Sequence, residues 1–378
     1  MKPMLRREYF LSENAYGRWI KTNKQRYLEI EAPDHYTLGR IEGKMLTRQI
    51  WLMQLLIYLM LIPFLFLKGV TYFTLKRIAI EHEKSVPKKY AKHYQLCKDE
   101  MKGMADSIVG ITYHHILIQN TFIEIMYGYL KPLCRKFPSQ LELGCTSVGV
   151  INEIDRTDPE ASERVVIGQN FDFSKFFVPM SSFVCHKVPG MPRIFCFRMG
   201  AMLALPAGKS EYGVMLNVNI IKSKIKGKPI IATGIRTRIG WYTCKSAERI
   251  KDMILTTPES ICYNLLIADQ NDLFAMEINP YWIPTVKVEN WAARTNRFVT
   301  PSLNRYLHHK NYSKKRQRHL EKLMESEYDG HISELDLLNN ILSDKPLISR
   351  PKTTAFVTNH RFGLGNPKPK KYGIIPDL

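Results

Sequence analysis

The stretch Gly144–Ile151, with the sequence GCTSVGVI, decides which fold this chain is expected to adopt. From Cys145 to Ile151 it is short and contains β-branched residues, which favours a β-strand. Before it, apolar residues recur at steps of three and four through much of 71–130, a spacing typical of helices. The chain therefore changes from helical to strand-like at about residue 140, and a cysteine stands at that change.

The rest of the chain divides into a helical front and a later part in which strands and helices follow in blocks. Residues 1–30 are polar and basic, which indicates an irregular lead-in, and Asp34 is placed to cap a helix over Thr37–Ile50. Strand patterns recur at Arg164–Gln169, Ser182–Lys187, Arg193–Met199, Gly213–Ile220, Cys262–Ala268, Leu273–Ile278, Thr285–Val288 and Thr354–Thr358. Helix patterns recur at Ser246–Thr256, Ser313–Glu325 and Ser333–Leu342. This order predicts a layered α+β domain rather than alternating βαβ units.

Length and composition allow a sizeable core. The chain has 378 residues, of which 45% are hydrophobic and 24% charged, and this fits one large domain or two modest ones. The net charge of +20 points to a membrane surface, a nucleic acid or an acidic substrate, or it serves solubility alone. The basic clusters at 314–318 and 368–371 are interpreted as solvated surfaces, and we expect no nucleic-acid partner.

The cysteine and histidine patterns favour neither disulfides nor a metal. The seven cysteines are odd in number, irregularly spaced and without a C-x-x-C pair, so a reducing compartment such as the cytoplasm is expected. The histidine pairs at 114–115 and 308–309 are adjacent residues, which do not share a helix face, and no third ligand stands at metal spacing. No nucleotide-binding loop is present either, and we expect no cofactor.

One apolar run has the length of a short membrane span. Ile50–Leu67 is 18 residues long and is broken only by Gln54 and Pro63. Three interpretations stay open: a helix buried in the protein core, a helix at a membrane surface or lipid substrate, and a true span. The N-terminus lacks the apolar region of a secretory signal.

Cys145 is the candidate nucleophile. A thiol that cleaves amides needs a base, a setting that lowers its pKa and donors for the oxyanion. A cysteine at a chain N-terminus can use its own α-amine as the base, because that amine has a pKa of about 7.7–8.0. Before a cut, the same thiol can attack the preceding carbonyl, and Gly144 gives the backbone room for that step. A small cysteine before a strand can equally be structural.

Several motifs, in order along the chain, resemble one family. The specific pair is Leu143–Ser147 (LGCTS) with Ile167–Phe173 (IGQNFDF). Shorter matches are an early glycine-rich stretch ending at Gly43, the strand Gly213–Asn219, Arg294–Arg297 (RTNR), and Ser313-x-x-Arg316. Together they resemble the isopenicillin-N (6-aminopenicillanic acid) acyltransferase-like family of N-terminal-nucleophile cysteine hydrolases, which is related to choloylglycine hydrolases and acid ceramidase.

The resemblance implies a role for each matching residue. Cys145 would be the nucleophile after a self-cut between Gly144 and Cys145, and Asp172 would hold its amine or orient it. Asn219 would donate to the oxyanion, and Asn296 would support the same pocket. Supporting positions are Ser147 near the cut, Asn170 in the Gly-Gln-Asn motif, Asn217 and Arg316.

Each role has a structural alternative that the residues leave open. Asp172 could be a turn or cap residue, Asn296 a loop asparagine and Arg316 a solvated helix residue. Asn217 and Asn219 lie two apart and share one strand face, so either could be the oxyanion donor.

The sequence also departs from the family pattern. The family's His-Thr-Asn-His reads Arg-Thr-Asn-Arg at 294–297, and the loop Glu153–Glu163 is longer than usual. The fold implied is a four-layer αββα sandwich with a mainly helical N-terminal segment. Residues 1–144 would form a small chain and 145–378 the catalytic chain, and the two would stay associated.

The expected activity is hydrolysis of a linear amide, or transfer of its acyl group, through an acyl-enzyme on Cys145. One alternative is a membrane-associated N-acyl lipid amidase of the same chemistry, suggested by Ile50–Leu67 and the basic charge. Another is a basic binding protein that is not processed, suggested by the missing histidines beside Asn296. The sequence does not name the substrate, the acyl acceptor or the oligomeric state.

Overall fold

The computed structural model describes most of the chain as two compact units. The described residues are 8–21, 26–62, 66, 69–130, 144–153, 165–172, 175–205, 207–225, 227–257, 259–308, 313–333, 336–345, 348, 354–359 and 372–374. The first unit comprises 1–130, 176–206 and 228–243, and the second comprises 131–175, 207–227 and 244–378. Much of the expected loop Glu153–Glu163 and the basic cluster 368–371 lie outside the described residues.

The first unit contains five strands in the order β1-β2-β3-β6-β7. They are β1 (Glu8–Ser12), β2 (Ala15–Lys21), β3 (Arg26–Glu31), β6 (Ser181–Lys187) and β7 (Ile194–Met199). The expected irregular lead-in over residues 1–30 was therefore wrong. In β2 buried and partly exposed residues alternate, a period of two that basic residues such as Arg18 obscure in the sequence. Only β3 and β6 pair in parallel, among the described strands of this unit.

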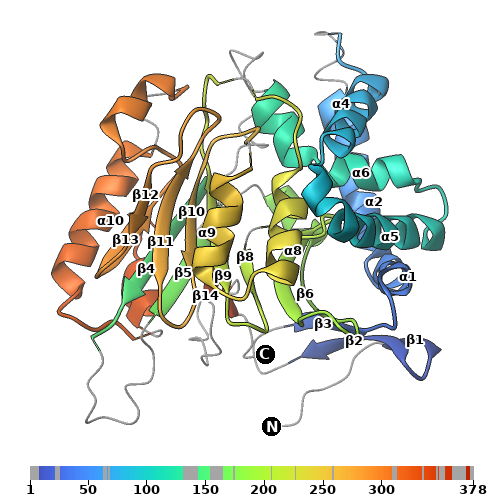
Figure 1. The fold of residues 1–378 in the computed structure, drawn as a ribbon, viewed down its shortest axis with the longest axis horizontal. Coiled ribbons are helices and arrows are strands. Elements are labelled where there is room, and N and C mark those ends of the chain that lie inside the picture. The colour runs from blue at the N-terminus through green and yellow to red at the C-terminus, as the bar shows by residue number, and fades with distance from the viewer. Residues whose placement is uncertain are drawn as a thin grey trace. The chain divides into compact units, whose positions relative to one another are not determined.

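The helices of the first unit lie together beside these strands (Figure 1). They are α1 (His35–Met45), α2 (Thr47–Leu56), α4 (Tyr72–Lys84), α5 (Ala91–Ser107), α6 (Tyr113–Asn120) and α8 (Thr233–Thr243). Asp34 caps α1 as expected, since its Oδ1 accepts from the Thr37 backbone N–H at 2.7 Å. The single helix expected over Thr37–Ile50 is instead divided at Leu46, which is the C-cap of α1 and the N-cap of α2.

Glycines explain how closely α1 and α5 pack. A Cβ on Gly39 would lie 1.9 Å from the backbone oxygen of Glu100, and one on Gly103 would lie 2.1 Å from that of Tyr36. Both contacts are impossible for a side chain, because real Cβ atoms do not come within 3.0 Å of such atoms. The early glycine-rich stretch is therefore a helix-packing feature.

The apolar run Ile50–Leu67 begins in α2 and continues as a π-helix over Ile57–Leu61. Its buried face includes Ile50, Met53 and Ile57, whereas Leu55, Leu59 and Phe66 are exposed. Among the residues that the structure describes, no helix has both the length and the apolar character to cross a membrane.

A cluster of buried charges joins the helices and strands of the first unit. Arg198 on β7 contacts Glu42 on α1 and Glu100 on α5, each at 2.6 Å, and Arg238 on α8 contacts Glu100 at 2.7 Å. All four side chains are fully buried. His186 on β6 hydrogen-bonds Arg238 at 3.0 Å, and burial together with Arg238 lowers the pKa of His186 well below its usual range. Such a cluster is costly to break, because removing one partner leaves another charge buried without compensation.

The second unit is built from two sheets between helices. The first sheet has the order β8-β9-β10-β11-β12 and is antiparallel, with β8 (Ala207–Ser210), β9 (Met215–Ile220), β10 (Tyr263–Ala268), β11 (Leu273–Ile278) and β12 (Thr285–Lys287). The second has the order β13-β4-β5-β14-β15, with β13 (Trp291–Arg294), β4 (Gly144–Ile151), β5 (Val165–Asp172), β14 (Thr354–Asn359) and β15 (Tyr372–Ile374).

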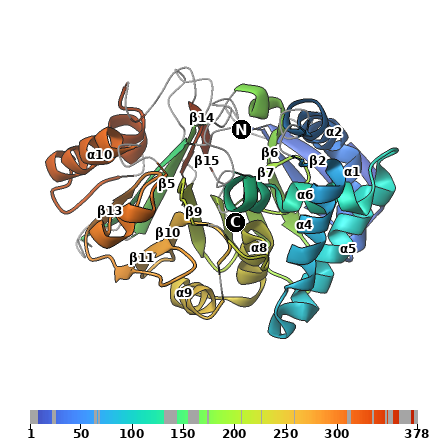
Figure 2. The same ribbon diagram turned by 90° about the horizontal axis from the view of Figure 1, so that it is seen from above.

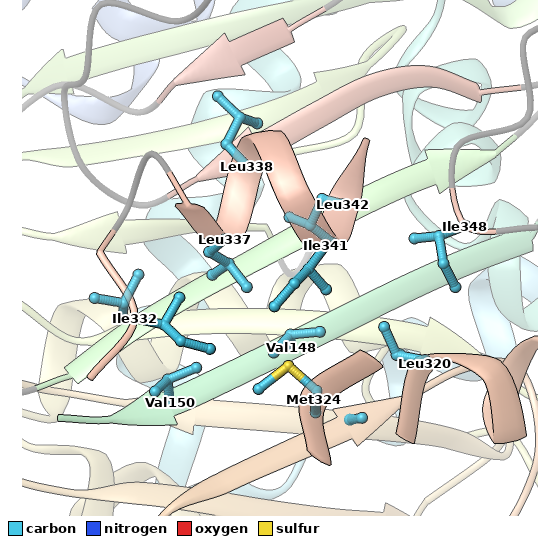
Figure 3. Close-up of a cluster of buried hydrophobic side chains, with 12 residues drawn as sticks. Val148, Val150, Leu320, Met324, Ile332, Leu337, Leu338, Ile341, Leu342 and Ile348 are labelled. Carbon is cyan, nitrogen blue, oxygen red and sulfur yellow. The ribbon is translucent and has the colours of Figure 1, made fainter. Parts of the chain in front are cut away.

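Apolar clusters hold these layers together. Ile167 of β5, Leu266 of β10 and Leu273 of β11 belong to the core between the sheets. On the other face of β4, Val148 and Val150 pack against α10 (Lys314–Glu327) and the π-helix Leu337–Leu342, as Figure 3 shows. Helix α9 (Ala247–Leu255) covers the outer face of the first sheet. Figure 2 shows the sequence of layers from α10 through both sheets to α9.

The second unit is thus the expected four-layer αββα sandwich, and α+β is the fold class. The expected strands at 145–151, 164–169, 262–268 and 273–278 and the helices at 246–256 and 313–325 are confirmed within a few residues. The segment expected as a helix over Ser333–Leu342 is a π-helix over Leu337–Leu342, and 334–335 lie outside the described residues. The elements β8, β13 and α8 were not expected.

The buried charges give the protein a pH-dependent stability that can be measured. Burial, opposed by Arg198, raises the pKa of the Glu42 carboxyl to about 8. Burial disfavours ionisation of Glu100 too, but Arg238 holds the pKa of that carboxyl well below its usual range. A raised pKa means that the folded chain binds more protons than the unfolded chain between pH 4.5 and about 8, so Glu42 stabilises less as pH rises through that window.

We therefore expect the free energy of unfolding in urea to fall more between these two pH values for the wild type than for Glu42→Gln, which cannot ionise. The exposed Glu248, paired with Lys251 on the surface, provides the control variant Glu248→Gln, which should keep the wild-type slope. A Glu42→Gln slope equal to that of the wild type would show that Glu42 does not titrate in this range.

Candidate active site

Cys145 is the second residue of β4 and is 1% exposed. Its preceding residue, Gly144, begins the strand and is not among the described glycines with a left-handed φ. Side chains alternate along a strand, so Cys145 and Ser147 share the face toward the first sheet, while Val148 lies on the face toward α10. The antiparallel register places Cys145 opposite Phe171 and Gly144 opposite Asp172.

Asn296 holds the backbone nitrogen of Cys145. The Cys145 N–H donates to Asn296 Oδ1 at 2.7 Å, and Asn296 Nδ2 donates to the carbonyl of Ile220 at the end of β9 at 2.8 Å. Asn296 is fully buried and is the second residue after β13. The nitrogen that a cut would free therefore already has a fixed hydrogen-bond acceptor.

Arg316 joins this pair to Asp172. Arg316 Nη2 donates to the same Asn296 Oδ1 at 2.5 Å, and Arg316 Nη1 lies 3.3 Å from Asp172 Oδ2. Asp172 is 2% exposed and Arg316 6% exposed, so this ion pair is shielded from water. The structure brings together four predicted site residues here, and Arg316 is buried rather than a solvated helix residue.

Asn219 lies beside Ser147, which is the next residue after Cys145 on the same face of β4. Asn219 Oδ1 accepts from Ser147 Oγ at 3.1 Å and from Gln169 Nε2 at 3.4 Å, and its Nδ2 donates to the Arg294 carbonyl at 3.3 Å. Asn219 is therefore a buried bridge between β9 of the first sheet and β4 and β5 of the second. Its role as oxyanion donor remains a prediction.

The other two supporting residues occupy different places. Asn170 faces away from Cys145, toward the helices, where its Nδ2 donates to the carbonyls of Leu342 at 2.7 Å and Ile348 at 3.3 Å. Asn217 is buried on the same face of β9 as Asn219. The Asn170 bonds anchor the end of the π-helix, so its contacts are structural.

Two arginines occupy the positions at which the resembled family has histidines. Arg294 ends β13, and burial lowers the pKa of its guanidinium, as it also does for Arg297. Arg297 Nη2 lies 3.3 Å from Asn304 Oδ1. Asn296 therefore stands between two cationic side chains whose charge is disfavoured by burial.

Sequence reasoning missed several buried polar residues around this site. Gln317, next to Arg316 on α10, accepts from Thr295 Oγ1 at 2.8 Å and donates to the Ala293 carbonyl at 3.0 Å. Gln169 lies opposite Ser147 in the β4–β5 register. The available signal was the unusual position of these residues: each is a polar side chain on the apolar face of an amphipathic element.

Three other buried cysteines, Cys97, Cys196 and Cys262, have unreactive settings. Burial raises the pKa of the Cys97 and Cys262 thiols to about 12 and also raises that of Cys196. Within the described residues no disulfide forms among the cysteines, and no group of three or more His, Cys, Asp or Glu side chains could hold a metal ion.

Comparison with known proteins gives a family. The model of the acyl-coenzyme A:6-aminopenicillanic acid acyl-transferase family matches residues 159–356, just over half of the chain. Among solved structures, an N-acylethanolamine-hydrolyzing acid amidase ortholog from Caenorhabditis elegans is similar at 14% identity, over 59% of this chain and 94% of that chain, with a TM-score of 0.46. No curated protein sequence matches the chain significantly.

The Asn296 bonds can be tested by stability alone. In a Cys145→Ala background, Asn296→Ala leaves the buried residue-145 N–H and the Arg316 guanidinium without their shared acceptor, and each such loss costs about 1–3 kcal/mol. We expect the free energy of unfolding in urea to fall by about 2–3 kcal/mol or more. Asn304→Ala, at a partly buried asparagine that accepts from Arg297, should cost less than about 1 kcal/mol. Equal losses in both variants would contradict the assignment.

Proposed function

The chain belongs to the acyl-coenzyme A:6-aminopenicillanic acid acyl-transferase family and is an enzyme of the amidohydrolase and acyltransferase type, and we propose that it acts through an acyl-enzyme on Cys145 after cutting itself before that residue. The observation that carries this proposal is the bond from the Cys145 nitrogen to Asn296, which Arg316 and Asp172 support. An ordinary buried strand residue would not need a dedicated asparagine, arginine and aspartate at its backbone nitrogen.

The self-cut begins with attack of the Cys145 sulfur on the carbonyl carbon of Gly144. The C–N bond breaks, the nitrogen takes up the thiol proton, and a thioester joins Gly144 to the sulfur. Water then hydrolyses the thioester, which leaves a carboxylate on Gly144 and a free thiol and amine on Cys145. Asn296 Oδ1 accepts from the nitrogen before the cut and can keep that bond with the amine afterwards.

The mature site would use that amine as its base. The amine takes the thiol proton, the thiolate attacks the amide carbonyl of the substrate, and the departing amine of the substrate receives the proton. The resulting acyl-enzyme is then attacked by water, which gives hydrolysis, or by a second amine, which gives acyl transfer. Asn219 is the proposed donor to the oxyanion.

Asp172 has an electrostatic part in this scheme. Its carboxylate neutralises Arg316, which otherwise would place an uncompensated positive charge next to the Cys145 amine. Pairing with Asp172 cancels that charge, so the Cys145 amine can take up the thiol proton without repulsion from Arg316. The Arg316 N–H still orients Asn296. Arg316 and Asp172 thus act as a unit that orients the base.

The contacts of the first unit support the expectation that the two chains stay associated. Strand β3 would belong to the small chain and β6 to the large chain, and these two strands pair in parallel. The buried contacts of Arg198 with Glu42 and Glu100 also join residues on opposite sides of the cut. Separation would expose these charges and the edges of both strands, which is strongly unfavourable.

Mass spectrometry of the purified protein tests the cut. We expect two fragments that separate before Cys145 and that elute together in gel filtration, whereas Cys145→Ala stays intact. Cys262→Ala, at another buried cysteine, is the matched control and should be cut normally. A wild-type protein that is fully active but uncut would contradict the proposal. Labelling by a thiol-reactive acyl probe that requires Cys145 would exclude a purely binding function.

A second candidate is the membrane-associated amidase acting on an N-acyl lipid. Arg48, Leu52, Leu55 and Leu59 recur at steps of four, three and four along α2 and its continuation, so they share one face. Leu55 is 41% and Leu59 69% exposed, so this face presents two large apolar side chains one helical turn apart at the surface. This face, together with the net charge of +20, favours an anionic membrane surface.

Flotation with anionic vesicles at low salt tests this candidate. We expect wild-type protein to float and a Leu55→Ser/Leu59→Ser double variant to float at least several-fold less, because it loses most of the inserted apolar area. Val286→Ser, which removes an exposed apolar residue from β12, should float like the wild type. Wild-type protein that stays at the bottom of the gradient at low salt would argue against membrane association.

A further inference from the structure

Three polar residues lie side by side on the first sheet of the second unit. In the strand register, Asn264 of β10 stands opposite Asn219 of β9 on one side and opposite Glu277 of β11 on the other. All three are almost completely buried, and β10 and β11 are otherwise apolar. A row of two amides and a carboxylate inside a core is costly unless each group has a partner.

Their partners are successive backbone groups of one loop, residues 294–300. Asn219 Nδ2 donates to the carbonyl of Arg294 at 3.3 Å. Asn264 Nδ2 donates to the carbonyls of Thr295 and Arg297, both at 2.7 Å. Glu277 Oε2 accepts from the Thr300 N–H at 2.9 Å, and its Oε1 accepts from the Val299 N–H.

The bonds of Asn264 enclose Asn296. They hold the carbonyls of the residues before and after it, Thr295 and Arg297, and so restrain the backbone that carries the Asn296 side chain. The Asn296 amide in turn meets the Cys145 nitrogen and the Ile220 carbonyl. Glu277 fixes the exit of the loop, and it does so with a charged acceptor, which forms stronger hydrogen bonds than a neutral one.

We propose that Asn264 and Glu277 are positioning residues that set the geometry of Asn296 at the Cys145 nitrogen, and thereby the rate of the self-cut. The inference rests on the proposed function of Cys145. Neither residue touches the reacting atoms. Their effect comes from geometry, since displacement of a reacting group by about 1 Å can cost about a hundredfold in rate.

The sharpest variant is Asn264→Asp. It keeps the shape of the side chain but replaces the amide donor with an acceptor that faces two carbonyl oxygens. We expect cutting to slow by about tenfold to a hundredfold near neutral pH. Burial and the two carbonyls favour the neutral form of the introduced carboxyl, and protonation restores one donor, so the deficit should shrink as pH falls.

Asn120→Asp is the matched control. Asn120 is also buried, and its Nδ2 also donates to two carbonyls, those of Ile116 at 3.0 Å and Ala201 at 2.9 Å, which belong to the first unit and not to the loop of Asn296. The same exchange there should cost stability in a similar way and leave the cutting rate of folded chains unchanged.

The experiment follows the full chain after a pulse of cell-free synthesis. The fraction cut before Cys145 is measured against time and pH for the wild type, Asn264→Asp, Asn120→Asp and Glu277→Gln, with each rate corrected for the soluble, protease-resistant fraction. Slower cutting in Asn264→Asp or Glu277→Gln than in Asn120→Asp, with relief of Asn264→Asp at lower pH, supports the proposal.

Three results would each overturn an idea, and they can be told apart. If the wild type is cut and both loop-holding variants are cut at the wild-type rate, the positioning inference fails and the proposed function stands. If Asn120→Asp slows as much as Asn264→Asp, the effect is general destabilisation and the inference also fails. If the wild type is never cut, the proposed function itself fails.

Discussion

The site depends on one oxygen atom, Asn296 Oδ1, that accepts from two buried donors. One donor is the backbone nitrogen of Cys145 on β4, and the other is the guanidinium of Arg316 on α10. These groups come from an outer helix, a central strand and the loop after β13. Both hydrogen bonds to the oxygen can therefore form only if these layers of the second unit are correctly placed relative to one another. The apolar clusters on both faces of β4 fix this placement, because they set the distance of α10 and of the first sheet from the strand.

Strand register is the constraint that makes this possible. Along β4, Cys145 and Ser147 face the first sheet, while Val148 and Val150 face α10. A slip by one residue would exchange the two faces and place the cysteine among the leucines of the helical layer. Gly168, opposite Val148 on β5, lets the π-helix Leu337–Leu342 pack close to the sheet, because a Cβ there would lie 2.7 Å from the Leu342 Cδ1 atom. The same packing that buries the core therefore holds the chemistry in place.

The sequence predicted secondary structure well where the apolar residues of a segment follow one clear helical or strand periodicity. The strands around Cys145 and Leu266 and the helices α9 and α10 have clear patterns, and their bounds were predicted closely. Helix α8 was missed because its buried face includes Arg236 and Arg238, and buried arginines look like solvent-facing residues in a sequence. The ion pair of Arg238 with Glu100 spans far separated segments, so no local pattern could reveal it.

The residues of the site also fall into two groups, those that the sequence predicted and those that it did not. Cys145, Asp172, Asn296 and Arg316 were predicted because their motifs follow the order of a family, and the structure brings all four together. Asn264 and Glu277 were not, since they act on backbone carbonyls and amides that have no sequence signature. Side-chain-to-backbone bonds depend on where a loop lies, and that is settled only by tertiary packing.

The chain as it stands has the hydrogen bond that the proposed mature site would use, so the proposed self-cut would need no rearrangement at this nitrogen. Before the cut, the Cys145 nitrogen is an amide donor to Asn296. After it, the same nitrogen would be an amine with more protons to donate and the same acceptor at the same place. A buried acceptor that was unoccupied before the cut would cost free energy, whereas one that serves both states costs none. The arrangement therefore favours a fold in which maturation changes the chemistry of one nitrogen and leaves its surroundings fixed.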